Sequence, residues 1–159
     1  MVSILMGSKS DLPVVEQAIQ VLKELEIAYE VRVLSAHRTP AETKEYIHSA
    51  EQRGTKVFIG AAGKAAHLPG VIASYTTKPV IGIPIKTSDL GGMDSLLSIV
   101  QMPSGIPVAT VAINGAANAA ILAAQMLSLQ SPELTEKLKT HREKQAQLVL
   151  ADNRELETL

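Results

Sequence analysis

Apolar and polar positions follow two kinds of pattern along the chain, and each kind predicts a different element. Short apolar runs rich in β-branched residues predict strands, at residues 2–6, 29–34, 56–59, 79–85 and 108–113. Segments with apolar residues at helical spacing predict helices, at residues 12–25, 40–53, 71–75, 93–100, 114–129 and 132–150. The strand segments lack period-two alternation, which indicates a parallel sheet covered by helices on both faces.

This order of elements is typical of an α/β protein. We predict a flavodoxin-like three-layer αβα sandwich with a central parallel sheet and an extra C-terminal helix. The chain has 159 residues and no internal repeat or linker, so we expect a single domain over residues 1–159. The last helix, about residues 132–150, carries only a thin apolar stripe: Leu134, Leu138, Leu148 and Val149. Two interpretations of this helix stay open, namely packing on a neighbouring subunit or a frayed, solvated tail.

Composition narrows the classes of function. Apolar residues make up 46% and charged residues 19%, as in globular proteins. The net charge of −1 gives no bulk attraction to nucleic acid or to an anionic membrane, so we expect neither partner. The sequence has no cysteine, no signal-type N-terminus and no apolar run that spans a bilayer, and we expect a cytoplasmic protein. Small side chains dominate and aromatic residues make up 3%, which favours a homo-oligomer.

Three loops that follow predicted strands are candidate sites, because open parallel sheets bind ligands beyond the carboxyl ends of their strands. The first, residues 7–11, has the sequence GSKSD. Gly7 permits a tight turn, and the hydroxyls and free N–H groups can hold an anion at a helix start. The loop is neither a Walker loop nor a dinucleotide fingerprint, because it has a single glycine. Taken alone, it favours the simpler interpretation of an N-cap by Ser10 or Asp11.

The second loop, residues 35–40, has the sequence SAHRTP. Arg38 offers a planar fork of donors that suits phosphate. His37 beside it can accept or donate a proton near neutral pH. Thr39 is expected to cap the helix that follows. The alternative interpretation is a helix-entry loop with a surface histidine and arginine.

The third loop, residues 60–70, has the sequence GAAGKAAHLPG. Its small residues let a ligand lie against bare backbone, and its apolar walls suit the exclusion of water from a reactive carboxyl group. His67 is the polar exception, and a satisfied structural histidine is the alternative. His48 and His141 lie on polar helices and are expected to be solvated; no spacing resembles a metal site. The glycine-rich residues 89–95 indicate either a mobile flap or a turn.

The motifs in these loops resemble those of the phosphoribosylaminoimidazole carboxylase catalytic-subunit family, and within it the bacterial mutase type. The matching segments are MGSKSD at residues 6–11, SAHRTP at 35–40, AAHLPG at 65–70, DSLLSIVQMP at 94–103, GIPVAT at 105–110 and NAA at 118–120. The resemblance spans residues 1–145. Several long motifs in the correct order make it specific.

The resemblance implies an isomerase of purine synthesis that converts 5-carboxyaminoimidazole ribonucleotide into 4-carboxy-5-aminoimidazole ribonucleotide. Family members use no metal or organic cofactor, and they form octamers with sites at subunit contacts. In their accepted route, carbon dioxide leaves the exocyclic nitrogen, is retained, and is attached to the adjacent ring carbon, which then loses its proton. We therefore expect a small ribonucleotide substrate and no cofactor.

The same resemblance implies roles for the residues of the three loops. The residues expected to bind the phosphate carry hydroxyl or guanidinium groups: Ser8, Ser10, Ser35 and Arg38. Asp11 is expected to bind the ribose, and Gly7 and Ala36 complete the substrate contacts. His37 is the expected proton carrier, with His67 as the second catalytic residue. The residues expected to line the pocket that retains carbon dioxide are mostly small or apolar: Gly63, Ala65, Ala66, His67 and Leu68.

Two positions depart from the family pattern. Ala61 and Lys64 stand where glycines are usual. Lys64 can add charge near the carboxylate or turn outwards to solvent, and both interpretations stay open. Residues 113–118 form a shorter segment than in many relatives, which we expect to alter a turn and not the chemistry.

Two other functions stand as alternatives. The nearer one is the carboxylase type of the same family, which adds free carbon dioxide to aminoimidazole ribonucleotide. Its members tend to carry lysine at the position of Arg38 and to lack the HLPG sequence of residues 67–70, so both features favour the mutase type. The other is a non-enzymatic flavodoxin-like module. A flavin site usually needs an aromatic stacking partner and a receiver needs clustered acidic residues, whereas the second strand here ends in Ser35.

Overall fold

A computed structural model describes residues 1–157 of the chain. Its centre is a parallel sheet of five strands in the order β2-β1-β3-β4-β5. The strands are β1 (Val2–Met6), β2 (Tyr29–Val33), β3 (Val57–Ala62), β4 (Val80–Pro84) and β5 (Ala109–Thr110). This is the strand order of flavodoxin-like folds, and it confirms the predicted class.

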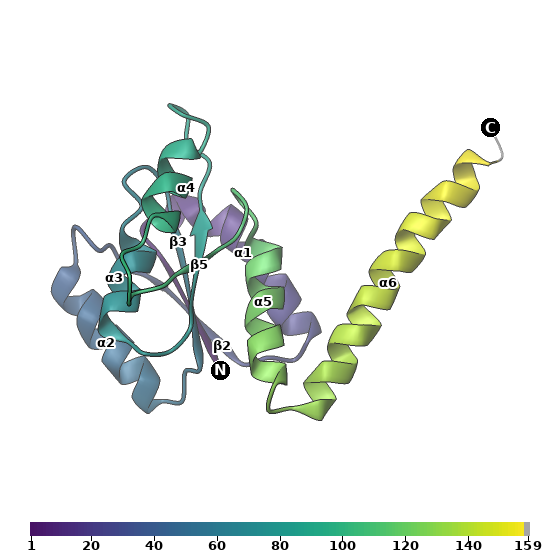
Figure 1. Cartoon of the computed structure of the whole chain (residues 1–159), viewed down its shortest axis with the longest axis horizontal. Helices are drawn as coiled ribbons and strands as arrows, with labels where there is room; N and C mark the ends of the chain where they lie inside the picture. Colours follow the sequence, from purple (N-terminus) through teal and green to yellow (C-terminus); the bar gives the residue numbers. More distant parts are fainter. Residues whose placement is uncertain (158–159) are drawn as a thin grey trace.

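Helices cover both faces of the sheet, which makes three layers (Figure 1). On one face lie α1 (Leu12–Glu24) and α5 (Ala116–Ser128), and on the other lie α2 (Pro40–Gln52), α3 (Leu68–Tyr75) and α4 (Met93–Val100). A short 3-10 helix, Lys9–Asp11, precedes α1. Each crossover between parallel strands therefore passes through a helix, as such sheets require.

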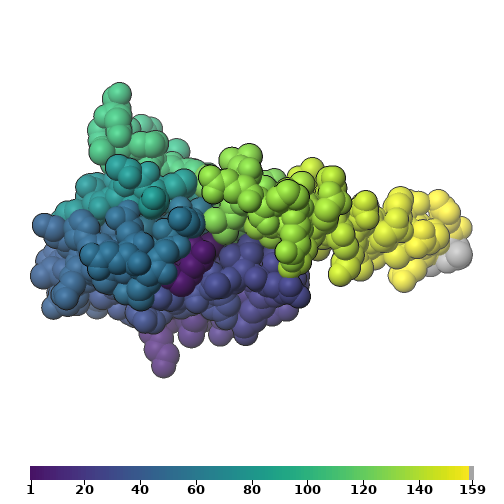
Figure 2. Space-filling view, turned by 90° about the horizontal axis from the view of Figure 1, so that it is seen from below, coloured from purple at the N-terminus to yellow at the C-terminus, as the bar shows by residue number. Residues whose placement is uncertain are grey.

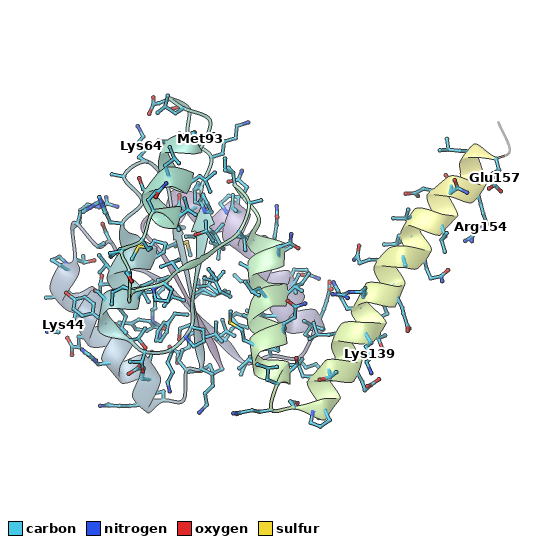
Figure 3. The ribbon with its side chains drawn as sticks, in the orientation of Figure 1. Lys44, Lys64, Met93, Lys139, Arg154 and Glu157 are labelled. Carbon is cyan, nitrogen blue, oxygen red and sulfur yellow. The ribbon has the colours of Figure 1, made fainter. Side chains whose placement is uncertain are left out.

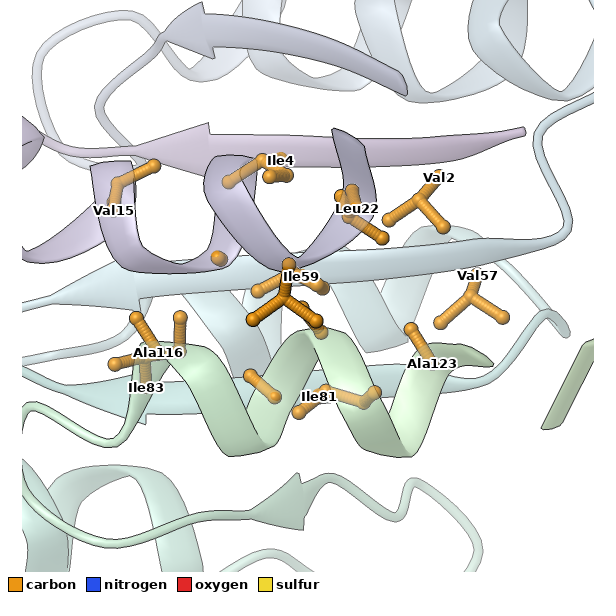
Figure 4. Close-up of a cluster of buried hydrophobic side chains, with 14 of the residues drawn as sticks. Val2, Ile4, Val15, Leu22, Val57, Ile59, Ile81, Ile83, Ala116 and Ala123 are labelled. Atoms are coloured by element: carbon orange, nitrogen blue, oxygen red, sulfur yellow. The ribbon is translucent and has the colours of Figure 1, made fainter. Parts of the chain in front are cut away.

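The core consists of two apolar layers separated by the sheet. Ile4 and Ile59 face α1 and α5, where they pack in one layer with Leu22 of α1 (Figure 4). Leu5 and Phe58 face α2 and α3 on the other side. Every residue of β1, β3 and β4 is buried, which explains why these strands show no alternation in the sequence. Burying each large side chain contributes about 1.5–3 kcal/mol, so the central strands form a rigid base for the loops at their ends.

Some predicted boundaries need correction. β5 contains only two residues, because Pro107 has no N–H for the ladder and a turn from Ala112 to Gly115 leads the chain directly into α5. α3 begins at Leu68, earlier than expected, with proline in its first turn. Thr39 stands at the N-cap of α2 but does not cap it with its side chain; its hydroxyl is hydrogen-bonded to the backbone of Ser35 instead.

The last helix, α6 (Pro132–Leu156), is longer than predicted and extends away from the three layers (Figures 1 and 2). Its start matches the expectation, since the Ser131 hydroxyl accepts a hydrogen bond from the N–H of Leu134. It continues past residue 150 because residues 151–156 contain no glycine or proline. Leu134 is its one buried residue, and four large apolar side chains near its far end are exposed: Leu148, Val149, Leu150 and Leu156. Within residues 1–157, no helix has the length and apolar character needed to cross a membrane.

Candidate active site

A cavity of about 530 Å³ lies beyond the carboxyl ends of the first four strands. Its lining residues come from the loops that follow these strands: Gly7, Ser8, Ser10, Asp11, Ser35, Ala36, His37, Arg38, Ala62, Gly63, Lys64, Ala65, His67, Leu68, Ile85, Lys86, Thr87 and Ser88. The cavity spans the position where β1 and β3 lie side by side although β2 separates them in sequence. Open α/β sheets bind ligands at such a point.

The loop after β1 turns its hydroxyl groups toward one another. The Ser8 hydroxyl accepts hydrogen bonds from the N–H of Ser10 at 3.3 Å and from its hydroxyl at 2.9 Å, so Ser8 caps the short helix. Asp11 occupies the N-cap position of α1, as the simpler interpretation expected, but its side chain makes no capping hydrogen bond. Burial raises the pKa of the Asp11 carboxyl above its ordinary value, and bonds from Ser10 and the backbone partly offset that rise.

The loop after β2 is tied to the loop after β1 by Arg38. Its guanidinium Nη2 donates to the carbonyl of Gly7 at 2.8 Å, and the Ser35 hydroxyl accepts from the N–H of Arg38 at 3.2 Å. A second contact runs from Arg38 Nε to the same hydroxyl at 3.5 Å. The arginine is exposed and several of its N–H donors stay free for a ligand. The serines and the guanidinium therefore form one donor-rich end of the cavity.

Two histidines from different loops meet beside this end. His37 Nε2 lies 3.1 Å from His67 Nδ1, and the two rings pack edge to face with an interplanar angle of 81°. Since a hydrogen bond needs one donor, one of these nitrogens carries a hydrogen while the other offers its lone pair. The His67 carbonyl also accepts from the N–H of Val71 at 2.8 Å, which fixes this residue to the start of α3. The pair can therefore act as one acid–base unit.

The loop after β3 lines the opposite end with small and apolar groups. Gly63 lines the cavity, and an added Cβ would make ordinary van der Waals contact with Ile85 and Thr87 at 3.6 Å, so the glycine leaves room for about one methyl group. Leu68 and Ile85 are buried and add apolar wall. Ala66 is the exception among the predicted residues: it is buried beneath the cavity in the second core layer and is not part of the lining.

The structure decides between the two interpretations of Lys64. Its φ of +54° lies in the left-handed region, which explains why a glycine suits this position. Its ammonium pairs with Asp89 at 2.8 Å and its side chain is 71% exposed, so it turns outwards and is neutralised there (Figure 3). The hydrogen-bonded ion pair raises the pKa of Lys64 and lowers the pKa of Asp89.

The loop after β4 supplies lining residues that the sequence did not single out: Ile85, Lys86, Thr87 and Ser88. The strand-end rule, applied to the fourth strand as to the other three, is the signal that points to them. The glycine-rich segment after them is a hydrogen-bonded turn, because Thr87 Oγ1 donates to Asp94 at 2.8 Å and accepts from the N–H of Gly92.

The other histidines lie away from the cavity. His48 is exposed on α2, as predicted. His141 differs from the prediction, because its side chain is only 17% exposed and lies 4.0 Å from Glu24 of α1. In the described part of the chain, no three His, Asp or Glu side chains cluster closely enough to hold a metal ion. Asp11 is the one carboxylate among the described lining residues.

The family of the chain follows from its similarity to known proteins. A family model described as AIR carboxylase matches residues 1–148. The chain belongs to the AIR carboxylase family. A family relative, the N5-carboxyaminoimidazole ribonucleotide mutase of Pyrococcus abyssi, is 61% identical over 142 residues, or 89% of this chain and 82% of the relative. The mutase of Thermotoga maritima is 55% identical over 158 residues, or 99% of this chain and 92% of the relative.

A fungal protein is also similar to the chain. The phosphoribosylaminoimidazole carboxylase of Candida glabrata is 49% identical over 159 residues, which are all of this chain and 28% of that protein. Among solved structures, PurE of Treponema denticola has a TM-score of 0.89 at 33% identity, covering 98% of this chain and 97% of the other. The family and the fold that the motifs predicted are thereby confirmed.

Proposed function

We propose that the chain is an N5-carboxyaminoimidazole ribonucleotide mutase, an isomerase that moves a carboxylate from the exocyclic nitrogen to the ring carbon of the nucleotide. The observation that carries this proposal is the contact of His37 with His67 in a cavity whose neighbouring end is rich in anion-binding donors. The curated relatives at 61% and 55% identity, which are named as this mutase, support the assignment. The reaction needs phosphate binding, retention of carbon dioxide and two proton transfers. The exocyclic nitrogen gains a proton when carbon dioxide leaves it, and the ring carbon loses one after carbon dioxide is attached.

The donor-rich end is the proposed phosphate site. Arg38 supplies a planar set of N–H groups, and Ser8, Ser10 and Ser35 supply hydroxyls that can rotate toward phosphate oxygens. The bond from Arg38 to Gly7 holds the guanidinium in place before the substrate arrives, so less side-chain freedom is lost on binding. Asp11, the carboxylate in the lining, is the proposed acceptor for the ribose hydroxyls.

The histidine pair is the proposed carrier of the proton. After carbon dioxide is attached to the ring carbon, the C–H bond at that carbon breaks and its electrons return to the ring. We assign the acceptor role to Nδ1 of His37, whose lone pair is free when the Nε2–H of the same ring donates to His67 Nδ1. This proton balances the one that the exocyclic nitrogen gains when carbon dioxide leaves it. Both rings line the cavity, so a bound nucleotide can reach them directly.

The opposite end is the proposed pocket for carbon dioxide. Gly63 and Ala65 expose backbone there, and Leu68 and Ile85 exclude water. Retention matters because an escaped molecule would turn a transfer within one site into a bimolecular reaction with dilute gas.

The carboxylase activity is the second candidate, favoured by the identity of 49% to the Candida glabrata carboxylase. The two functions differ in whether carbon dioxide leaves the site. The enzyme is incubated with the carboxyamino substrate bearing ¹³C in its carboxylate, in a buffer of unlabelled bicarbonate. The mutase transfers the label to the product. Loss of the label, together with turnover of the decarboxylated nucleotide that rises with bicarbonate, would establish the carboxylase instead.

We also propose that the chain is one domain that assembles as a homo-octamer in the cytoplasm. The four exposed apolar side chains near the end of α6, which the chain's own core leaves uncovered, support packing of this helix on a neighbouring copy. Sedimentation equilibrium of the whole chain tests the assembly. A monomer at micromolar concentration would contradict it. The absence of a cofactor stays a prediction.

A further inference from the structure

Two lysines line the cavity, and they differ in their partners. Lys64 is neutralised by Asp89 at 2.8 Å. Lys86 is exposed, and among the ion pairs of residues 1–157 none involves its ammonium. The second lysine therefore brings an uncompensated positive charge to the cavity.

Lys86 lies at the far end from the phosphate site proposed above. It follows β4, whereas Arg38 follows β2, and β1 and β3 lie between these strands. Three strand spacings separate the two loops by about 14 Å, a length comparable with an extended ribonucleotide. The cavity therefore has one cationic side chain at each end, with the histidine pair and the small residues after β3 between them.

The backbone at Lys86 is held in place. Its N–H donates to the side-chain carbonyl of Asn114 at 2.9 Å. Asn114 in turn has a left-handed backbone with φ of +58°, and its own N–H donates to the carbonyl of Pro84 at 2.8 Å. These two hydrogen bonds, made by a residue with a left-handed backbone, hold the chain in place where β4 ends. The flexible lysine stem thus starts from a fixed point beside the pocket that we assign to carbon dioxide.

We propose that Lys86 binds the carboxylate of the substrate and product. This inference rests on the proposed function, because the reaction has an anion at each end of the nucleotide: the phosphate and the migrating carboxylate. A lysine suits a carboxylate that changes position, since its ammonium is a compact charge on a flexible stem with three donors. Arg38, with its rigid fork held by Gly7, suits the phosphate that stays in place.

The test compares two ligands that differ only in the carboxylate. Dissociation constants of 4-carboxy-5-aminoimidazole ribonucleotide and 5-aminoimidazole ribonucleotide are measured by titration calorimetry on the full chain. In Lys86→Gln, the carboxylated ligand is expected to bind about 10- to 100-fold more weakly while the decarboxylated ligand changes by less than about twofold. Lys86→Arg, which keeps the charge, should retain most of the preference for the carboxylated ligand.

Lys64→Gln is the matched control, because it removes a neighbouring lysine whose charge is already balanced by Asp89. It should leave the ratio of the two dissociation constants unchanged. The inference is overturned when Lys86→Gln leaves that ratio as in the wild type, whether both affinities fall together or neither falls. Failure of the proposed function is a separate result: the wild-type enzyme would then neither bind the carboxylated nucleotide nor form it.

Discussion

The two ends of the cavity are built in opposite ways. At the end formed after β1 and β2, polar groups are bonded to one another before any ligand arrives, as the bond from Arg38 to Gly7 shows. At the end formed after β3 and β4, the lining residues Gly63 and Ala65 have little or no side chain. The first end is therefore suited to bind an anion through placed donors, whereas the second is suited to hold a small neutral molecule between small and apolar groups.

The largest effect is expected between the two ends, at the histidine pair. His37→Asn removes the proposed proton carrier while keeping a polar side chain of similar reach. We expect kcat to fall by about 10²–10⁴-fold, with ligand affinity close to that of the wild type. Steady-state kinetics and calorimetry with the product measure the two quantities. Near-normal kcat would remove His37 from the acid–base role.

The next effect concerns the donor-rich end. Arg38→Ala removes the proposed charge-assisted bonds to phosphate together with the bond to the Gly7 carbonyl, so KM should rise by about 10- to 100-fold. The value of kcat should change far less, because the histidines remain. An equal fall in kcat at saturating substrate would place Arg38 in the chemistry and erase the distinction between the ends.

A smaller effect is expected at the apolar end. In Gly63→Ala, the added Cβ meets Ile85 and Thr87 at 3.6 Å, an ordinary contact, so the free energy of unfolding should stay unchanged. The methyl group fills part of the cavity, and kcat should fall roughly fivefold, equivalent to about 1 kcal/mol. Loss of the ¹³C label to bicarbonate should rise in parallel.

Gly82→Ala is the contrasting variant. Its Cβ would clash with Ile99 Cγ2 in the core, so this change should lower the melting temperature, unlike the change at Gly63. A destabilised Gly63→Ala would show that the apolar end is packed tightly and is not an open pocket.

The smallest effect is expected away from both ends. Arg53 donates two hydrogen bonds to Glu30 at the sheet edge and, with Tyr46, lowers the pKa of Glu30 to about 2. Because this folded-state pKa lies below the ordinary value of 4.5, the stabilisation is complete above 4.5 and is lost as the pH falls toward 2. Glu30→Gln should lower Tm by about 2 °C at neutral pH, with no change in kcat.

The pH series is the check on this last variant. Thermal melts of wild type and Glu30→Gln should converge as the pH falls from neutral toward 2. A difference in Tm that stays constant over this range would show that the ion pair is not its cause.

The sequence predicts the centre of the fold better than its margins. β1, β3 and β4 are buried on both faces, so their apolar runs are unambiguous. β5 is a two-residue edge strand whose length depends on the turn before α5, and the end of α6 depends on the absence of a breaking residue. Neither feature has a strong local pattern.

The candidate site shows the same division. The strand-end rule indicates the loops that hold His37 and His67. Their 3.1 Å contact, however, joins residues 30 positions apart, and no motif or periodicity in the sequence predicts it. Lys86 carries no motif, and its place in the cavity follows only from the neighbouring position of β4 in the sheet. Ala66 looks like its neighbours in sequence, yet the turn of the chain before α3 buries it.

A crystal structure of the enzyme with 4-carboxy-5-aminoimidazole ribonucleotide tests the central claim most directly. The account predicts phosphate oxygens within hydrogen-bonding distance of the Arg38 guanidinium and the Ser8 hydroxyl, with the imidazole ring beside His37. A nucleotide whose phosphate lies elsewhere in the assembly, with Arg38 and the histidine pair facing water, would contradict it.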